Sequence, residues 1–281
     1  MTAMTKEQAH SIAAPCPLPD IQSETVRAPR ASVTAGIDGL KVRILLPDGR
    51  VVLASARLVA HVPMGHRGVH MSRLARVFSP DGTPVPLDFT LPERVHQLAA
   101  TQDSDRVVIR LSWEDAVLRA APVTGTMGLQ PYKAEVAAHW TPDSLVWTTR
   151  IQTIAMLACP CSKALSEENG FHNQRGILQA EVAGYHPTEL ESLLGLVDRA
   201  GSNRTHPVLR REDEKDVIDV MSREGTFRFV EDAASRLLEL LGDAGYGSPS
   251  IHVRSLESIH AHDAVAWAGP RGEGLSEGIQ L

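Results

Sequence analysis

The chain has 281 residues, of which 43% are hydrophobic and 22% charged, and its formal net charge is −6. This balance predicts an ordinary folded protein with a large core. The negative charge argues against a nucleic-acid binder, which needs a surplus of lysine and arginine. The sequence shows neither a basic-then-apolar leader nor an apolar run of membrane-spanning length, so we expect a cytoplasmic protein without a membrane partner.

Both ends of the chain have the composition of loose tails. Residues 1–36 are rich in Ala, Pro, Ser and Thr without periodicity, and residues 270–281 are rich in glycine. Between them we expect two modules, at 37–145 and 146–269. Cys16 falls in the first tail and is interpreted as an incidental thiol, because three cysteines in a chain of this length make a poor disulfide framework.

The first module opens with a predicted hairpin. Residues 40–46 and 51–54 are β-rich and flank a Pro-Asp-Gly turn at 47–49. A helix is expected near 91–100 and a further strand at 106–111.

The second module opens with a long extended segment at 147–157, rich in Val, Thr and Ile. Thr188 begins a predicted helix with capping-box spacing, and residues 229–241 form an amphipathic helix. Residues 250–254 and 264–267 are expected to be strands. The sequence therefore predicts an α+β fold with two similar halves.

The densest polar cluster is Cys159-Pro160-Cys161, followed a dozen residues later by His172. Thiolate and imidazole are natural metal ligands, whereas the alternative is a buried cysteine pair with a surface histidine. In an extended Cys-Pro-Cys the two side chains point to opposite faces. One thiolate would then bind an ion, and the other would be free for acid–base work or packing.

Three further polar clusters carry chemistry or, alternatively, only face water. Residues 210–215 are a charge-rich segment before a helical stretch, and the alternative is a solvated helix start. Residues 257–263 place a glutamate three positions before a histidine, with a polar loop as the alternative. Residues 66–73 hold two arginines and two histidines around a glycine, which suits a phosphate group, or else form an exposed basic turn.

Taken together and in order, these motifs resemble the signatures of the GTP cyclohydrolase IB family. The resemblance implies the tunnelling fold, in which each subunit has two tandem modules of antiparallel sheet and helices. It also implies a homotetramer with active sites at subunit interfaces. The matching motifs are His66–Arg73, Cys159–Lys163, His172–Arg175, Asp213–Lys215, Phe229–Asp232 and Glu257–Asp263.

The implied reaction converts GTP and water to 7,8-dihydroneopterin triphosphate and formate, a step toward folate-type pterins. Water must attack carbon 8 of guanine, so a bound divalent metal ion (Zn, Mn or Fe) is expected, because it lowers the pKa of water. Opening the imidazole ring then requires proton donors and acceptors with pKa values near neutrality, such as His and Cys.

The resemblance also implies a role for individual residues. The implied metal ligands are Cys159, His172, Glu214 and His260. The implied catalytic residues are Cys159, Cys161, Glu257 and His260. The implied substrate-binding residues are Glu231, which would anchor guanine, and Arg67, His70, Arg73, Lys163 and Arg175.

Three alternatives stay open from the sequence. An archaeal-type GTP cyclohydrolase would share the motifs but release a cyclic-phosphate pterin. A sister enzyme that reduces a nitrile with NADPH would need a lone reactive cysteine, which Cys-Pro-Cys fits poorly. A zinc-stabilised binding module without activity would unfold when its metal is removed, whereas a catalytic site would lose activity and keep its fold.

Overall fold

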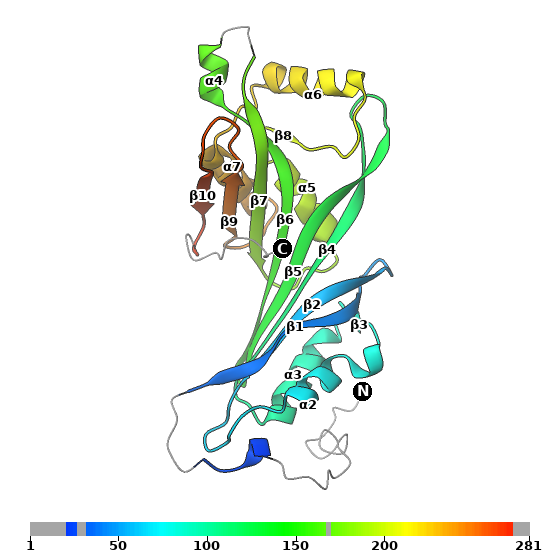
Figure 1. Ribbon diagram of the computed structural model, residues 1–281, viewed down its shortest axis with the longest axis vertical. Helices are drawn as coiled ribbons and strands as arrows, with labels where there is room; N and C mark the ends of the chain where they lie inside the picture. Colours follow the sequence, from blue (N-terminus) through cyan, green and yellow to red (C-terminus); the bar gives the residue numbers. More distant parts are fainter. Residues whose placement is uncertain (1–20, 27–31, 167–169, 272–281) are drawn as a thin grey trace. The chain divides into compact units, whose positions relative to one another are not determined.

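The computed structural model describes residues 21–26, 32–166 and 170–271, which form a mixed α+β structure (Figure 1). The predicted tails at 1–36 and 270–281, and with them Cys16, lie mostly outside these residues. The chain divides into two compact units. Unit 1 is Met1–Trp113 with Val136–Trp147, and unit 2 is Glu114–Glu135 with Thr148–Leu281. Three long strands contribute to both: β4 (Val107–Ala120), β5 (Met127–Thr141) and β6 (Ser144–Ala158).

Unit 1 opens with the predicted hairpin. Strands β1 (Thr34–Leu45) and β2 (Val51–His61) pair antiparallel, and Leu45 opposes Val51 across the turn. Gly49 closes this turn at a φ of 87°, a conformation that suits glycine. The strands of this unit follow the order β3-β1-β2-β4-β5-β6, with β3 at Val85–Pro86. The hairpin prediction is confirmed.

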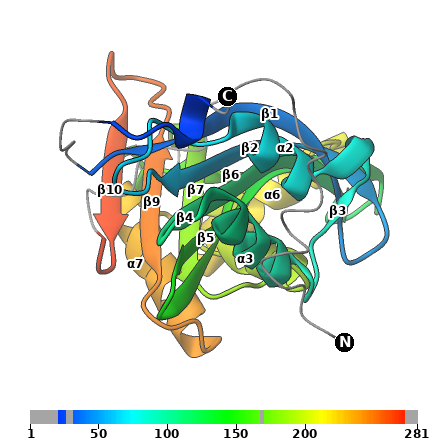
Figure 2. The ribbon, with the colours of Figure 1, turned by 90° about the horizontal axis from the view of Figure 1, so that it is seen from below.

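Two helices of unit 1 pack side by side (Figures 1 and 2). The predicted helix near 91–100 is confirmed as α3 (Leu91–Gln102). The other, α2 (Met71–Phe78), buries Leu74 and Phe78. The sequence also allowed residues 66–73 to be an exposed basic turn. This alternative is wrong for residues 71–73, which form the first turn of α2. Two short 3-10 helices complete the unit, η1 (Ile21–Ser23) and η2 (Pro80–Gly82).

In unit 2 the strands follow the order β10-β9-β7-β6-β5-β4, and β8 also pairs with β6. The strands not yet given are β7 (Asn173–Ala183), β8 (Asn203–Arg204), β9 (Ser250–Ser255) and β10 (Ala264–Ala268). The helices are α4 (Pro160–Leu165), α5 (Leu190–Asp198), α6 (Arg211–Glu224) and α7 (Val230–Asp243). Helix α7 packs on β9 and β10 and contacts α5 (Figure 1). No helix among the described residues is long and apolar enough to cross a membrane.

The predicted amphipathic helix at 229–241 is confirmed by α7, whose buried side chains include Ala233, Leu237 and Leu241. The prediction that a helix begins at Thr188 is wrong. Helix α5 begins at Leu190 after Glu189, and Thr188 does not cap it. The reason is that the turn before α5 is closed instead by the Glu189 backbone N–H, which donates to the carbonyl of His186.

A charged cluster is buried among the strands of unit 2. The guanidinium of Arg150 on β6 lies 2.6 Å from Glu181 on β7 and 3.5 Å from Glu135 on β5, and all three side chains are less than 10% exposed. Arg271 also pairs with Glu181. Since an unpaired buried charge is costly, each of these groups depends on the others.

The buried carboxylate of Asp213 anchors the start of α6. It accepts hydrogen bonds from the Val123 N–H at 2.9 Å, from the Thr124 N–H and hydroxyl at 2.8 Å each, and from the Arg210 N–H at 2.9 Å. Burial by itself would raise the pKa of Asp213, but these hydrogen bonds outweigh burial and lower its pKa below the ordinary value. One side chain thus ties the loop between β4 and β5 to α6.

We expect Asp213→Asn to lower the thermal midpoint by several degrees, because its amide would direct N–H groups at N–H donors. A carboxyl with a lowered pKa stabilises the fold above its unfolded pKa, and that contribution is lost as pH falls through the folded pKa. The difference in thermal midpoint between wild type and variant should therefore be largest near pH 7. It should shrink below about pH 4, which is the pKa of the carboxyl in the unfolded chain. Thermal scans from pH 3 to 8 measure it, with the exposed Asp219→Asn as the control. An undiminished gap at pH 3 would contradict this account.

Candidate active site

A cavity of about 350 Å³ opens in unit 2 where β6 and β9 end and α7 begins. Five residues that the sequence predicted as functional line it, and they come from four segments of the chain. These residues are Cys159, His172, Glu231, Glu257 and His260. The structure thus brings together side chains that are as far apart in the sequence as Cys159 and His260.

The pairing of β6 with β7 places Cys159 beside His172. Ala158 opposes Asn173 in the antiparallel register, and one residue further the Cys159 N–H donates to the carbonyl of His172 at 3.2 Å. The strands hold a thiol and an imidazole at the same end of the sheet without any contribution from the side chains themselves.

Cys159 is the N-cap of α4, and its Sγ accepts from the Ser162 N–H at 3.4 Å. The prediction that Cys159, Pro160 and Cys161 are extended is therefore wrong beyond the first residue. Proline suits the first turn of a helix because its missing N–H would have no partner there. The helix turns Cys161 to the surface, where it is exposed and does not line the cavity.

Gln174 connects two of the predicted site residues. Its amide donates from Nε2 to Glu257 Oε1 at 3.2 Å, and its Oε1 lies 3.1 Å from His172 Nδ1. Because a carboxylate only accepts, Nε2 must face Glu257, and Oε1 then accepts from His172 Nδ1–H. The Nε2 lone pair of His172 is left available for a ligand. Sequence reasoning missed Gln174, although it stands inside the motif at 172–175.

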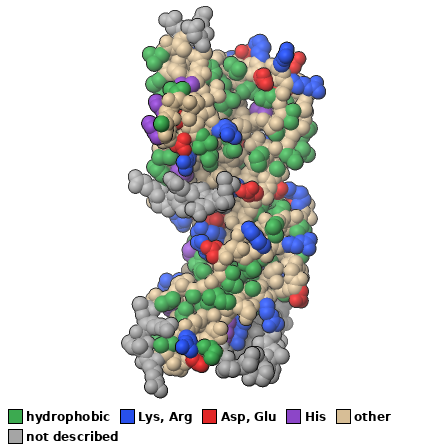
Figure 3. All heavy atoms as spheres, in the orientation of Figure 1, with side chains coloured by type: hydrophobic (Ala, Val, Ile, Leu, Met, Phe, Trp, Pro, Cys, Tyr) green, Lys and Arg blue, Asp and Glu red, His purple; other side chains and the backbone are tan. Residues whose placement is uncertain are grey.

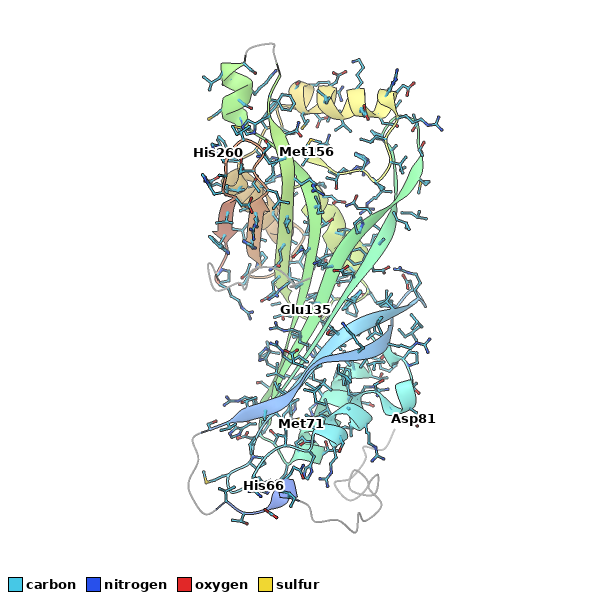
Figure 4. All side chains as sticks on the ribbon, in the orientation of Figure 1. His66, Met71, Asp81, Glu135, Met156 and His260 are labelled. Carbon is cyan, nitrogen blue, oxygen red and sulfur yellow. The ribbon has the colours of Figure 1, made fainter. Side chains whose placement is uncertain are left out.

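The segment between β9 and β10 carries His260, and hydrogen bonds to Asp263 hold its two ends together. The Asp263 carboxylate accepts from Arg254 Nε at 2.8 Å and from the Glu257 N–H at 3.3 Å. His260 and His262 stack with ring centroids 5.3 Å apart, and both are exposed at the cavity. Histidine side chains gather at the surface on this side of unit 2 in Figure 3, and Figure 4 marks His260. Sequence reasoning did not single out His262.

Glu231 reaches the cavity from the first turn of α7. Asp232 fixes this turn, because its carboxylate accepts from the Phe229 N–H at 2.9 Å. Glu231 therefore lines the cavity while its neighbour caps the helix. Arg228, which precedes the helix, also lines the cavity, and burial lowers the pKa of its guanidinium.

The remaining predicted residues of unit 2 lie outside the cavity lining. Glu214 is exposed on α6, one position after the buried Asp213. Lys163 on α4 places its ammonium 5.9 Å from the ring centroid of Phe227. Arg175 on β7 is exposed and faces a second hollow of about 330 Å³.

The other predicted substrate-binding residues belong to unit 1. Arg67 pairs with Glu24 at 2.7 Å, and the His70 N–H donates to Gln102 Oε1 at 2.7 Å, directly before α2. Arg73 lies in the first turn of α2. The arginines and lysine predicted to bind a triphosphate are thus divided between the two units.

The cavity offers the donor types of a mixed metal site, namely one thiol, three imidazoles and carboxylates. These are ligands for Zn, Mn or Fe, so the chemistry of the lining fits the predicted ion. Within the described ranges, however, no group of three or more His, Cys, Asp or Glu side chains stands ready to hold an ion. Cys159 and His172 are therefore the part of the predicted ligand set that the fold already juxtaposes.

Comparison with known proteins identifies the family. Residues 18–266 match the family described as type I GTP cyclohydrolase folE2, and the chain belongs to it. GTP cyclohydrolase FolE2 of Desulfovibrio desulfuricans is 26% identical over 88% of this chain and 95% of its own length. GTP cyclohydrolase FolE2 1 of Burkholderia lata is 32% identical over 92% of this chain and 95% of its own. The predicted GTP cyclohydrolase is thereby confirmed.

One solved structure resembles the chain only weakly. Uricase from Arthrobacter globiformis has a TM-score of 0.44 and 10% identity over 89% of this chain and 96% of that chain. A likeness at this level supports no argument about the fold or the site.

We expect Gln174→Leu to lower the turnover of GTP by roughly ten- to a hundredfold, as the loss of a side chain that orients a ligand typically does. Leucine has a similar size but cannot link His172 to Glu257. Steady-state kinetics would measure the change, with thermal scans to confirm folding. Asn173→Leu, at the exposed neighbour, is the control. Wild-type turnover in Gln174→Leu would show that the link is dispensable.

Proposed function

We propose that the chain converts GTP and water to 7,8-dihydroneopterin triphosphate and formate. Its family membership shows that the chain acts as a GTP cyclohydrolase in folate biosynthesis. What we propose in addition is the identity of the product. The cavity supports it, because it gathers Cys159, His172, Glu231, Glu257 and His260 in one place. The non-enzymatic binding module does not agree with membership of a family of enzymes.

The carboxylate of Glu231 selects guanine in this proposal. It accepts from the ring N–H and from the exocyclic amine of the base together, which a neutral side chain cannot do equally well. The start of α7 favours this role, since the N-terminus of a helix stabilises a negative charge. His260 then moves a proton to the ring nitrogen that is released as the imidazole opens, and Glu257 orients His260. Cys161, which is exposed on α4 and lies outside this cavity lining, would be the alternative proton donor only in a site completed by a neighbouring subunit.

A divalent metal ion, Zn, Mn or Fe, belongs to the proposed site. Cys159 and His172 would hold it and Glu214 would be a further ligand, and His260 would be either the fourth ligand or, when not bound to the ion, the proton donor described above. When bound, the ion lowers the pKa of a water molecule that attacks carbon 8 of guanine. The free lone pair at His172 Nε2, fixed by the hydrogen bond at Nδ1, supports this assignment.

We propose further that the protein is the type IB enzyme of the cytoplasm, with the tunnelling fold of two tandem modules in a homotetramer. An active site between subunits would account for the residues that lie outside the cavity. Glu214 on α6 and the arginines around α2 are exposed or half-buried, so a neighbouring subunit can bring its own copies to the cavity. Arg67, His70, Arg73, Lys163 and Arg175 bind the triphosphate in this arrangement.

Incubation of the purified protein with GTP and each of the three metals should release one formate for each GTP consumed. The product should become a fluorescent pterin on oxidation and should retain a linear triphosphate, which mass spectrometry resolves from a cyclic phosphate. Chelation should abolish the reaction and leave the circular dichroism spectrum intact. Unchanged GTP with every metal would refute the proposal, and a cyclic phosphate would establish the archaeal-type product.

Cys159→Ser should lose bound metal and at least a hundredfold in turnover, because a hydroxyl is a poor substitute for a thiolate. Cys161→Ser is the matched control on the same helix, and it should keep its metal, since Cys161 lies outside the cavity lining. Metal content by elemental analysis separates the two variants. Full metal retention in Cys159→Ser would overturn the assignment, and equal loss in both would mean that both thiolates bind.

A further inference from the structure

Ser202 lies in the short connection between α5 and β8 and is 3% exposed. Its Oγ accepts two backbone hydrogen bonds, from the Ala158 N–H at 3.0 Å and from the Arg228 N–H at 3.1 Å. Ala158 directly precedes Cys159, and Arg228 directly precedes Phe229, the N-cap of α7. One hydroxyl oxygen therefore joins the two segments that carry Cys159 and Glu231 to the cavity.

Backbone hydrogen bonds reinforce this junction. The Arg228 N–H also donates to the carbonyl of Ala158 at 3.1 Å, and the Ser202 N–H donates to the carbonyl of Met156 at 2.8 Å. Gly201 makes the approach to β6 tight, because a Cβ atom there would lie 2.7 Å from the Ala155 Cβ. The connection holding Ser202 is thus pressed directly against the strand that ends at Cys159.

The side chain of Arg228 holds the same connection from the other direction. Its guanidinium donates from one nitrogen to the carbonyls of Arg199 and Ala200, at 3.1 Å each, and to that of Gly201. These carbonyls follow the end of α5, where unpaired carbonyl groups attract positive charge. The start of α7 is consequently fixed to residues 199–202 by backbone and side chain together.

We propose that Ser202 is a positioning residue that sets the separation between the Cys159 segment and the Glu231 segment, and thereby the selectivity for guanine. A carboxylate that reads two N–H groups of a base must be held to within a fraction of an ångström. In Ser202→Ala the two segments lose their common acceptor, and Glu231 can drift without any change in its own chemistry. This inference rests on the proposed role of Glu231.

Inosine triphosphate tests the inference, because it keeps the ring N–H of GTP and lacks the exocyclic amine. Its inhibition constant divided by the KM for GTP reports the selectivity for that amine, and neither constant depends on the fraction of protein that is folded. The ratio should be about ten or more in the holoenzyme, as expected for one hydrogen bond to a charged group. Ser202→Ala should lower this ratio at least threefold, and Ser202→Thr, which keeps the hydroxyl, should restore it.

Three further variants separate positioning from stability. Ser104→Ala in unit 1 removes another buried hydroxyl that bonds the backbone, at His61 and Arg106, so it should cost stability and leave the ratio unchanged. Glu231→Leu, which has no acceptor for the exocyclic amine, should bring the ratio near one, and adding Ser202→Ala should then lower it no further, since both changes act through one carboxylate.

The outcomes separate the positioning role of Ser202 from the guanine-binding role of Glu231. A wild-type ratio in Ser202→Ala, beside a ratio near one in Glu231→Leu, would overturn the positioning role and leave the guanine anchor standing. An unchanged ratio in Glu231→Leu would refute the anchor itself. A fall in Ser104→Ala equal to that in Ser202→Ala would show that the ratio only follows general stability.

Discussion

The antiparallel register of β6 and β7 is the constraint on which the candidate site depends. Eleven consecutive residue pairs fix these strands, from Thr148 opposite Ala183 to Ala158 opposite Asn173. A shift by one residue would turn the side chains of one strand to the opposite face. Cys159 and His172 meet only because the register carries through to the ends of both strands. The strand β9, which leads to Glu257 and His260, is in turn positioned by its pairing with β7.

The elements predicted from the sequence are those with a clear local pattern, such as the β1–β2 hairpin and α7. Strand β7 was not predicted, because its residues 176–182 are largely buried on both faces and include Gln179 and Glu181, so no polar alternation marks them. Strand β5 contains Pro131 and the buried Glu135, which interrupt its pattern in the same way. In both strands, the β conformation is favoured by packing within the folded protein, and the local sequence does not show the alternation of a typical strand.

The residues of the candidate site were also predicted only in part. The motifs located five residues of the cavity, because cysteine, histidine and glutamate at close spacing are recognisable chemistry. They could not show that Cys161 would be turned away by α4, since that follows from a proline in a helix's first turn. Nor could they reveal Ser202, which stands in no motif and acts only through hydrogen bonds to backbone far along the chain.

The buried cluster of Arg150, Glu135 and Glu181 has a consequence for the evolution of this chain. Its three strands each contribute one charge, and Arg271 adds a second positive charge beside Glu181. A single replacement would leave an uncompensated charge in the interior. Arg150, Glu135 and Glu181 can therefore change only as a set, and they should covary among homologues, with neutral or reversed combinations in place of single substitutions. The side chain of Arg271 is 56% exposed, so its position is less constrained.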